Sequence, residues 1–74
     1  MEEKEFKIRA YGYSELAQLY LPNVHPKSAA NQFRKWIYYN PKLLEALKEC
    51  AYKKRTKIFT PVQVTVIIKF LGEP

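Results

Sequence analysis

Hydrophobic and polar residues alternate near the start of the chain and then change to a helical period. Residues 6–11 place Phe6, Ile8 and Ala10 on one face, with two cations and a tyrosine on the other. Strict alternation of this kind predicts a half-buried β-strand. Gly12 follows directly and is expected to end it.

A first helix is predicted from the residues that follow. Ser14 offers an N-cap, because its hydroxyl can accept a hydrogen bond from a free backbone N–H of the first turn. Apolar residues then recur at helical spacing, at Leu16, Ala17, Leu19 and Tyr20. The helix should stop near Leu21, since Pro22–Val24 is expected to form a loop.

The second helix carries the most informative pattern. It is expected over about residues 26–39, because the fixed φ of proline suits the first helical position. Stepping about 100° per residue sorts its side chains onto two faces. The apolar face holds Ala29, Ala30, Phe33 and Ile37, with Trp36 at its border. The other face is basic and amide-bearing, and it holds Lys27, Asn31, Arg34, Lys35 and Tyr38.

Asn40 and Pro41 repeat the combination of cap and proline, and they predict a third helix over about residues 41–50. Its inner face is expected to hold Leu43, Leu44 and Leu47. A dense run of cations follows, at Lys53, Lys54, Arg55 and Lys57. This density disfavours a packed element, whereas residues 58–59 fit a short strand. A basic turn that leads into a strand is typical of a β-wing.

Residues 62–71 fit two structures. Their β-branched side chains alternate as in a strand, but a helical face also runs through Val64, Ile67, Ile68 and Leu71. The flanking residues favour a helix, because Thr60 to Gln63 form a capping box with proline at N1 and Gly72 is an expected C-terminal stop. Helix is the preferred interpretation, and a strand stays open as the alternative.

Composition excludes most catalytic chemistry. The chain has no Asp, one His and one Cys, so it has neither an internal disulfide nor a cysteine-based metal site. His25 is expected to cap the second helix or to face solvent, and Cys50 to pack as a small hydrophobe. Zinc, P-loop and dinucleotide signatures are absent. We therefore expect no enzyme, no cofactor, no metal ion and no small-molecule substrate.

The charge is positive and uneven. Thirteen basic residues against seven acidic ones give +6 at pH 7, and from Phe6 onward 12 basic residues face 4 acidic ones. This excess favours a polyanionic partner, although small soluble domains often carry a net charge of about 2–8. Residues 1–5 are expected to be a flexible acidic N-terminus that does not resemble a signal peptide. We expect a cytoplasmic protein with no membrane partner.

Three segments resemble MerR-type and excisionase-like DNA-binding domains. Residues 13–20 are similar to their E-L-A-x-L first helix, and residues 24–37 to their V-S-P-x-T-L-R-x-W second helix. Residues 57–64 resemble the R-x-Y-T-x-x-x-V segment in which the wing strand leads into a packing helix. This chain departs from that pattern in its longer connection between the first two helices and in its additional helix at 41–50. The whole chain also resembles a family of short gut-Bacteroidetes proteins described as a domain of unknown function, which implies a bacterial or phage source.

The resemblance refines the fold that the patterns predict. Seventy-four residues form one small domain, and we expect it over residues 6–74. Its class is mainly α (α+β). The resemblance implies a helix-turn-helix domain with a short β-wing that pairs with the N-terminal strand.

Two functional hypotheses remain. In the first, the domain binds double-stranded DNA in a regulatory, phage or mobile-element role, alone or as a homodimer or with a protein partner. The second helix would enter the major groove and offer Lys27, Asn31, Arg34, Lys35 and Tyr38. The wing cations Lys53, Lys54, Arg55 and Lys57 would bind backbone phosphates. In the second, the domain is a protein-interaction adaptor whose aromatic surface is Trp36, Tyr38, Tyr39 and Tyr52.

Overall fold

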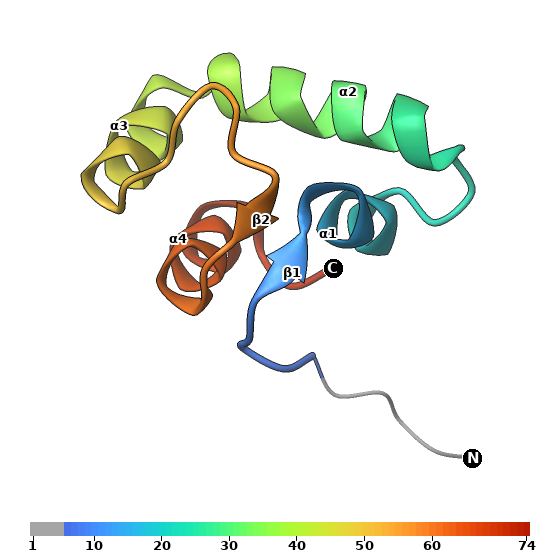
Figure 1. Ribbon diagram of the computed structural model, residues 1–74, viewed down its shortest axis with the longest axis horizontal. Helices are drawn as coiled ribbons and strands as arrows, with labels where there is room; N and C mark the ends of the chain where they lie inside the picture. The colour runs from blue at the N-terminus through green and yellow to red at the C-terminus, as the bar shows by residue number, and fades with distance from the viewer. Residues whose placement is uncertain (1–5) are drawn as a thin grey trace.

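The computed structural model describes residues 6–74, which form four helices and a two-stranded antiparallel sheet. The predicted acidic segment 1–5 lies outside the described residues. The elements are β1 (Tyr11–Gly12), α1 (Tyr13–Tyr20), α2 (Pro26–Tyr38), α3 (Pro41–Glu49), β2 (Ile58–Phe59) and α4 (Pro61–Leu71). In Figure 1, α2 spans the top of the molecule, with α1, the sheet and α4 beneath it and α3 beside its C-terminal end. The prediction of a small, mainly helical α+β domain is confirmed.

Side-chain caps start the last three helices, as the sequence predicts. His25 Nδ1, Asn40 Oδ1 and Thr60 Oγ1 each accept a hydrogen bond from a backbone N–H of the first turn, at 3.2 to 3.3 Å. A proline occupies the first helical position in each case. Gly72, with φ at 83°, ends α4. Residues 62–71 are therefore helical, and the strand alternative is wrong.

The N-terminal strand is shorter than predicted and buries a different face. Only Tyr11 and Gly12 pair with β2, so the predicted strand over 6–11 is wrong in extent. Tyr11 is buried, whereas Ile8 is 51% exposed. The Tyr11 ring stacks on Phe6, with their centroids 5.4 Å apart. A large aromatic ring buries more apolar area than Ile8, so the alternation is wrong at Ile8, Ala10 and Tyr11, whereas Phe6 packs against the core as predicted.

Ser14 is not the N-cap of α1, because the helix begins two residues earlier than that cap would allow, at Tyr13, and the Glu15 carboxylate does the capping. Gly12 occupies the cap position, and its backbone N–H donates to Glu15 Oε1 at 3.1 Å. Glu15 Oε2 also accepts a hydrogen bond from Arg9 at 2.9 Å. The Arg9 guanidinium and the Gly12 N–H together hold the pKa of Glu15 below its ordinary value.

Phe33 of α2 lies at the centre of the core. Its ring contacts those of Tyr13, Tyr20, Trp36 and Phe59 at centroid distances of 5.3 to 6.1 Å. These neighbours come from α1, α2 and β2, so one fully buried side chain joins three elements. The other fully buried residues are Leu16, Ala17, Ala29, Ile37, Leu43, Leu47, Val64 and Ile67, together with Phe59.

We expect Phe33→Ala to abolish cooperative unfolding. Truncating a buried Phe costs about 3–5 kcal/mol, which is comparable to the whole stability of a small domain. Thermal melts followed by far-UV circular dichroism measure the change. Val62→Ala, at a position that is 61% exposed, should melt like the wild type. A Phe33→Ala transition near the wild-type Tm would contradict this assignment.

The end of α3 turns the chain back into the core. The Ala51 N–H donates to the Lys48 carbonyl at 3.1 Å, and the Tyr52 N–H donates to the Leu47 carbonyl at 3.0 Å. This pair of bonds is a Schellman motif. Ala51 adopts the left-handed conformation that this motif requires, with φ at 68°. The turn delivers Tyr52, which is 5% exposed, to the core directly before the run of cations.

Ala51→Gly is expected to stabilise the protein by about 0.5–1 kcal/mol. The left-handed conformation costs a residue with a Cβ about 1–2 kcal/mol, which exceeds the greater chain entropy that glycine loses on folding. The Tm should rise by about 4 °C. Ala46→Gly, inside α3, is the matched control and should lower the Tm. A lower Tm for Ala51→Gly would refute the strain at this turn.

Candidate nucleic-acid interface

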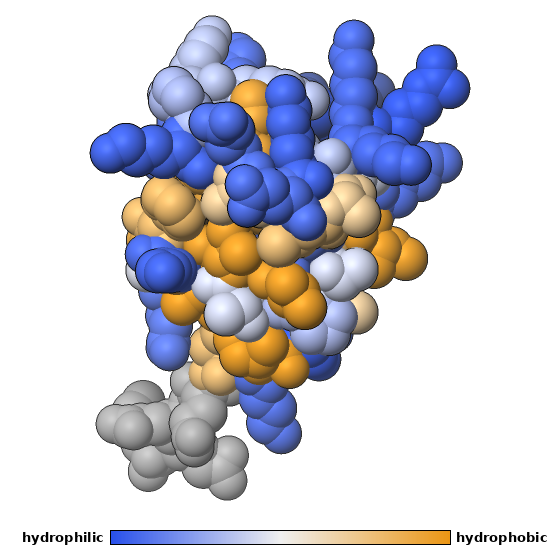
Figure 2. All heavy atoms as spheres, turned by 90° about the vertical axis from the view of Figure 1, so that its left-hand side faces the viewer, coloured by the Kyte–Doolittle hydropathy of each residue, from blue (hydrophilic) through white to orange (hydrophobic). Residues whose placement is uncertain are grey.

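Arg34 of α2 lies beside Lys54 and Arg55 of the segment before β2. We name residues 53–57 the basic loop. Figure 1 shows the chain between α3 and β2 rising toward α2 before it descends to the sheet. In Figure 2, hydrophilic side chains gather at this upper end, and apolar ones lie below them. Two segments that are separated by α3 thus contribute to one polar surface.

Side chains of α2 and of the basic loop line a common hollow of about 310 Å³, which we name the loop-side hollow. Its lining is Arg34, Tyr38, Lys54 and Arg55. Among the described residues, none that lines it is acidic. The structure therefore brings four of the sequence-predicted site residues together.

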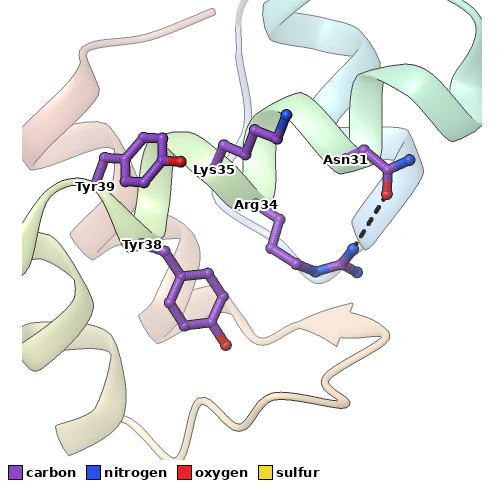
Figure 3. Close-up of a pocket in the computed structure, with 5 residues that line it drawn as sticks. All are labelled: Asn31, Arg34, Lys35, Tyr38 and Tyr39. Carbon is purple, nitrogen blue, oxygen red and sulfur yellow. Dashed lines mark hydrogen bonds between the residues drawn. The ribbon is translucent and has the colours of Figure 1, made fainter.

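Two further hollows adjoin Arg34. The outer hollow, of about 360 Å³, lies on the solvent side of α2 and is lined by Asn31, Arg34, Lys35, Tyr38 and Tyr39 (Figure 3). The α1-side hollow, of about 440 Å³, lies between the start of α1 and the basic loop, and Lys57, Thr56 and Arg34 are among its lining residues. Arg34 lines all three hollows, so it is the central side chain of this surface.

Arg34 is held in place from two sides. Its Nη1 donates a hydrogen bond to Asn31 Oδ1 at 3.3 Å, one turn earlier on α2 (Figure 3). Its guanidinium carbon lies 5.0 Å from the centre of the Tyr13 ring, within the range of a cation–π contact. Both contacts restrict the guanidinium before any ligand binds.

Tyr13 is itself fixed by a buried hydrogen bond. Its hydroxyl lies 2.8 Å from the hydroxyl of Tyr52, 39 residues further along the chain. Both rings also contact Phe59 of β2, at centroid distances of 4.6 and 6.0 Å. The adaptor surface that includes Tyr52 is therefore wrong at this residue, because Tyr52 is buried. No local signal in the sequence pairs these two tyrosines.

Lys27 and Lys53 stand apart from the other predicted site residues, since neither lines the three hollows. Lys27 lies in the first turn of α2, seven residues and about 10 Å before Arg34 along the helix axis. The Lys53 N–H donates to Thr56 Oγ1 at 2.8 Å, which closes the turn of the basic loop. The contribution of Lys53 to the shape of the loop is thus made by its backbone.

Residues 6–74 contain no group of three potential metal ligands among His, Cys, Asp and Glu. No helix in this range has the length and apolar character needed to span a membrane; the longest, α2, has 13 residues.

These observations define the class: a small, mainly helical α+β domain with a basic, hollowed face. The chain belongs to the DUF4248 family, a domain of unknown function whose family model matches residues 7–74. No curated protein and no solved structure matches it. The resemblance to a family of unknown function is thereby confirmed.

Ionisation of the buried tyrosine pair is expected to destabilise the fold at alkaline pH. Burial raises the pKa of Tyr13 and that of Tyr52 above the ordinary value of about 10. Their protonated forms therefore contribute stability that is complete below about pH 10 and is lost as the pH rises further, because the unfolded chain ionises first. The free energy of unfolding should fall by up to about 1.4 kcal/mol per pH unit for each tyrosine that stays protonated.

Urea unfolding between about pH 9 and pH 11 measures this decline. The double substitution Tyr13→Phe/Tyr52→Phe removes both hydroxyls, so no unpaired hydroxyl stays buried. The decline of the unfolding free energy with pH should therefore become shallower. Tyr39→Phe, at a position that is 80% exposed, should keep the wild-type decline. The pKa of Tyr20, raised to about 12 by burial, leaves a residual decline in every variant. An unchanged slope in the double variant would contradict the assignment.

Proposed function

We propose that the domain binds double-stranded DNA through the face that α2 and the basic loop form together. The observation that carries this proposal is the loop-side hollow, where Arg34 of α2 meets Lys54 and Arg55 of the loop. Converging cations with no acidic neighbour in that lining suit a phosphate backbone, which dominates the affinity of proteins for DNA.

The orientation of α2 supports a role in the major groove. Ala29, Phe33 and Ile37 face the core, so the opposite side of the helix, with Asn31 and Lys35, is exposed. Amide and cationic side chains at this position can bind the edges of adenine and guanine. Figure 3 shows Lys35 pointing away from the basic loop, whereas Arg34 and Tyr38 point toward it. The exposed side of α2 would thus contact bases, and the side that faces the basic loop would contact the DNA backbone.

The likeness to MerR-type and excisionase-like domains supports the same proposal. Helices α1 and α2 pack against each other and are joined by residues 21–25. Strand β2 pairs with the N-terminal strand β1, as predicted, and the basic loop that enters β2 is therefore not a hairpin. One helix of 13 residues reads few base pairs, so we propose that the protein acts as a homodimer or with a partner.

Fluorescence anisotropy with a labelled duplex of random sequence tests the proposal. Between about 50 and 200 mM salt, about five phosphate contacts give a log–log slope near −4.5. Arg34→Ala/Lys35→Ala should weaken binding roughly tenfold or more and make the slope shallower. Lys7→Ala/Lys69→Ala removes the same charge from exposed positions outside the three hollows and should have the smaller effect.

Two outcomes would count against DNA binding. The first is wild-type protein that does not bind the duplex at the lowest salt concentration. The second is an equal loss of affinity in the two double variants, which would show that binding depends on the net charge of the protein and not on this face.

The second candidate is a protein-interaction adaptor. Tyr39 is 80% exposed and Trp36 is 38% exposed, and this aromatic area supports a protein interface. Tyr52 cannot belong to it. Absence of duplex binding, together with a purified protein partner that stays bound at high salt, would favour this candidate over DNA.

A further inference from the structure

We propose that Arg34, Lys54 and Arg55 bind one and the same backbone phosphate, and that Tyr13 and Tyr52 are the positioning residues of this site. The inference rests on the proposed function. It assigns Arg34 to the DNA backbone instead of to a base, which is the contact that its position on α2 alone suggests. The ligand is a phosphodiester group of a nucleic acid.

The loop-side hollow has the composition of a phosphate site. Two guanidinium groups and one ammonium group line it, and the hydroxyl of Tyr38 supplies a further donor. Three like charges around one hollow repel one another in the free protein. A bound anion offsets this repulsion, so the arrangement favours a single anionic group, such as a phosphodiester, between the three cations.

The flank of α2 that faces away from the loop differs in chemistry. Helical geometry places Gln32 and Trp36 there, and both are uncharged. Lys35, the cation nearest to that flank, points away from the loop and so does not converge with the loop cations. Arg34, at the boundary between α2 and the loop, is the residue that can share a ligand with the loop cations.

The two tyrosines control how far the basic loop lies from α2. Tyr52 immediately precedes the loop, and its hydroxyl is joined to Tyr13 at 2.8 Å. The face of Tyr13 lies beneath Arg34, with 5.0 Å between the ring centre and the guanidinium carbon. One buried pair thus positions the α2 cation and the start of the segment that carries the loop cations. Neither tyrosine changes the net charge when it is replaced by phenylalanine.

A double-mutant cycle tests the shared phosphate by duplex anisotropy. We compare Arg34→Gln, Lys54→Gln and the double variant with a control cycle of Arg34→Gln and Lys27→Gln, since Lys27 lines none of the three hollows. If the cations share one phosphate, the loss of affinity in the double variant should differ at least threefold from the product of the two single losses. In the control cycle, the loss in the double variant should equal that product. The salt slope of the Arg34/Lys54 double variant should become shallower by at most about 0.9, which is one phosphate, because Arg55 still faces that phosphate. Multiplicative losses and a change of about 1.8 would overturn the shared site.

Tyr52→Phe tests the positioning role at constant charge. We expect weaker binding and a shallower salt slope in protein that circular dichroism shows to be folded, because the loop cations no longer close on the phosphate. If the single variant does not fold, Tyr13→Phe/Tyr52→Phe, which leaves no hydroxyl unpaired, replaces it. Wild-type affinity and slope in the folded variant would overturn the positioning role. Wild-type protein that does not bind DNA would instead refute the proposed function itself.

Discussion

The hydrogen bond between Tyr13 and Tyr52 joins the core of this protein to its basic face. It forms where α1 begins and where the chain returns from α3, so it connects segments that are 39 residues apart. A hydroxyl pair in such an apolar setting must be mutually satisfied, since an unpaired buried hydroxyl costs about 1–3 kcal/mol. Below the pair, Phe33 and Phe59 complete the aromatic packing, and above it Arg34 covers the Tyr13 ring.

Most of the helical structure could be predicted from the sequence because helix starts are local chemistry. His25, Asn40 and Thr60 accept hydrogen bonds within three residues, and the prolines that follow restrict the same short stretch of backbone. The N-terminal strand could not be predicted in this way. Its inward face depends on which aromatic ring stacks on Phe6, and that is a choice between tertiary contacts rather than a local preference.

The candidate site, too, could be predicted only where it depends on local structure. Helical periodicity alone places Asn31, Arg34, Lys35 and Tyr38 on the polar part of α2. Their meeting with Lys54 and Arg55 is not visible in the sequence, because the turn that redirects the chain contains Ala51 in a conformation that usually requires glycine. Lys27 shows the opposite case. It shares the helical face but lies two turns before Arg34, since periodicity gives direction and not distance along the axis.

The sheet, although it has only two residues in each strand, has a kinetic consequence. Helices α1 and α2 are neighbours in sequence and can pack as soon as the short connection between them forms. The pairing of Tyr11 with Phe59, in contrast, joins residues that are 48 positions apart in the chain of 74, and closure of a long loop is entropically costly before its contacts form. We therefore expect β1 and β2 to meet late in folding. The basic loop, which enters β2, would then acquire its final shape only in the last step.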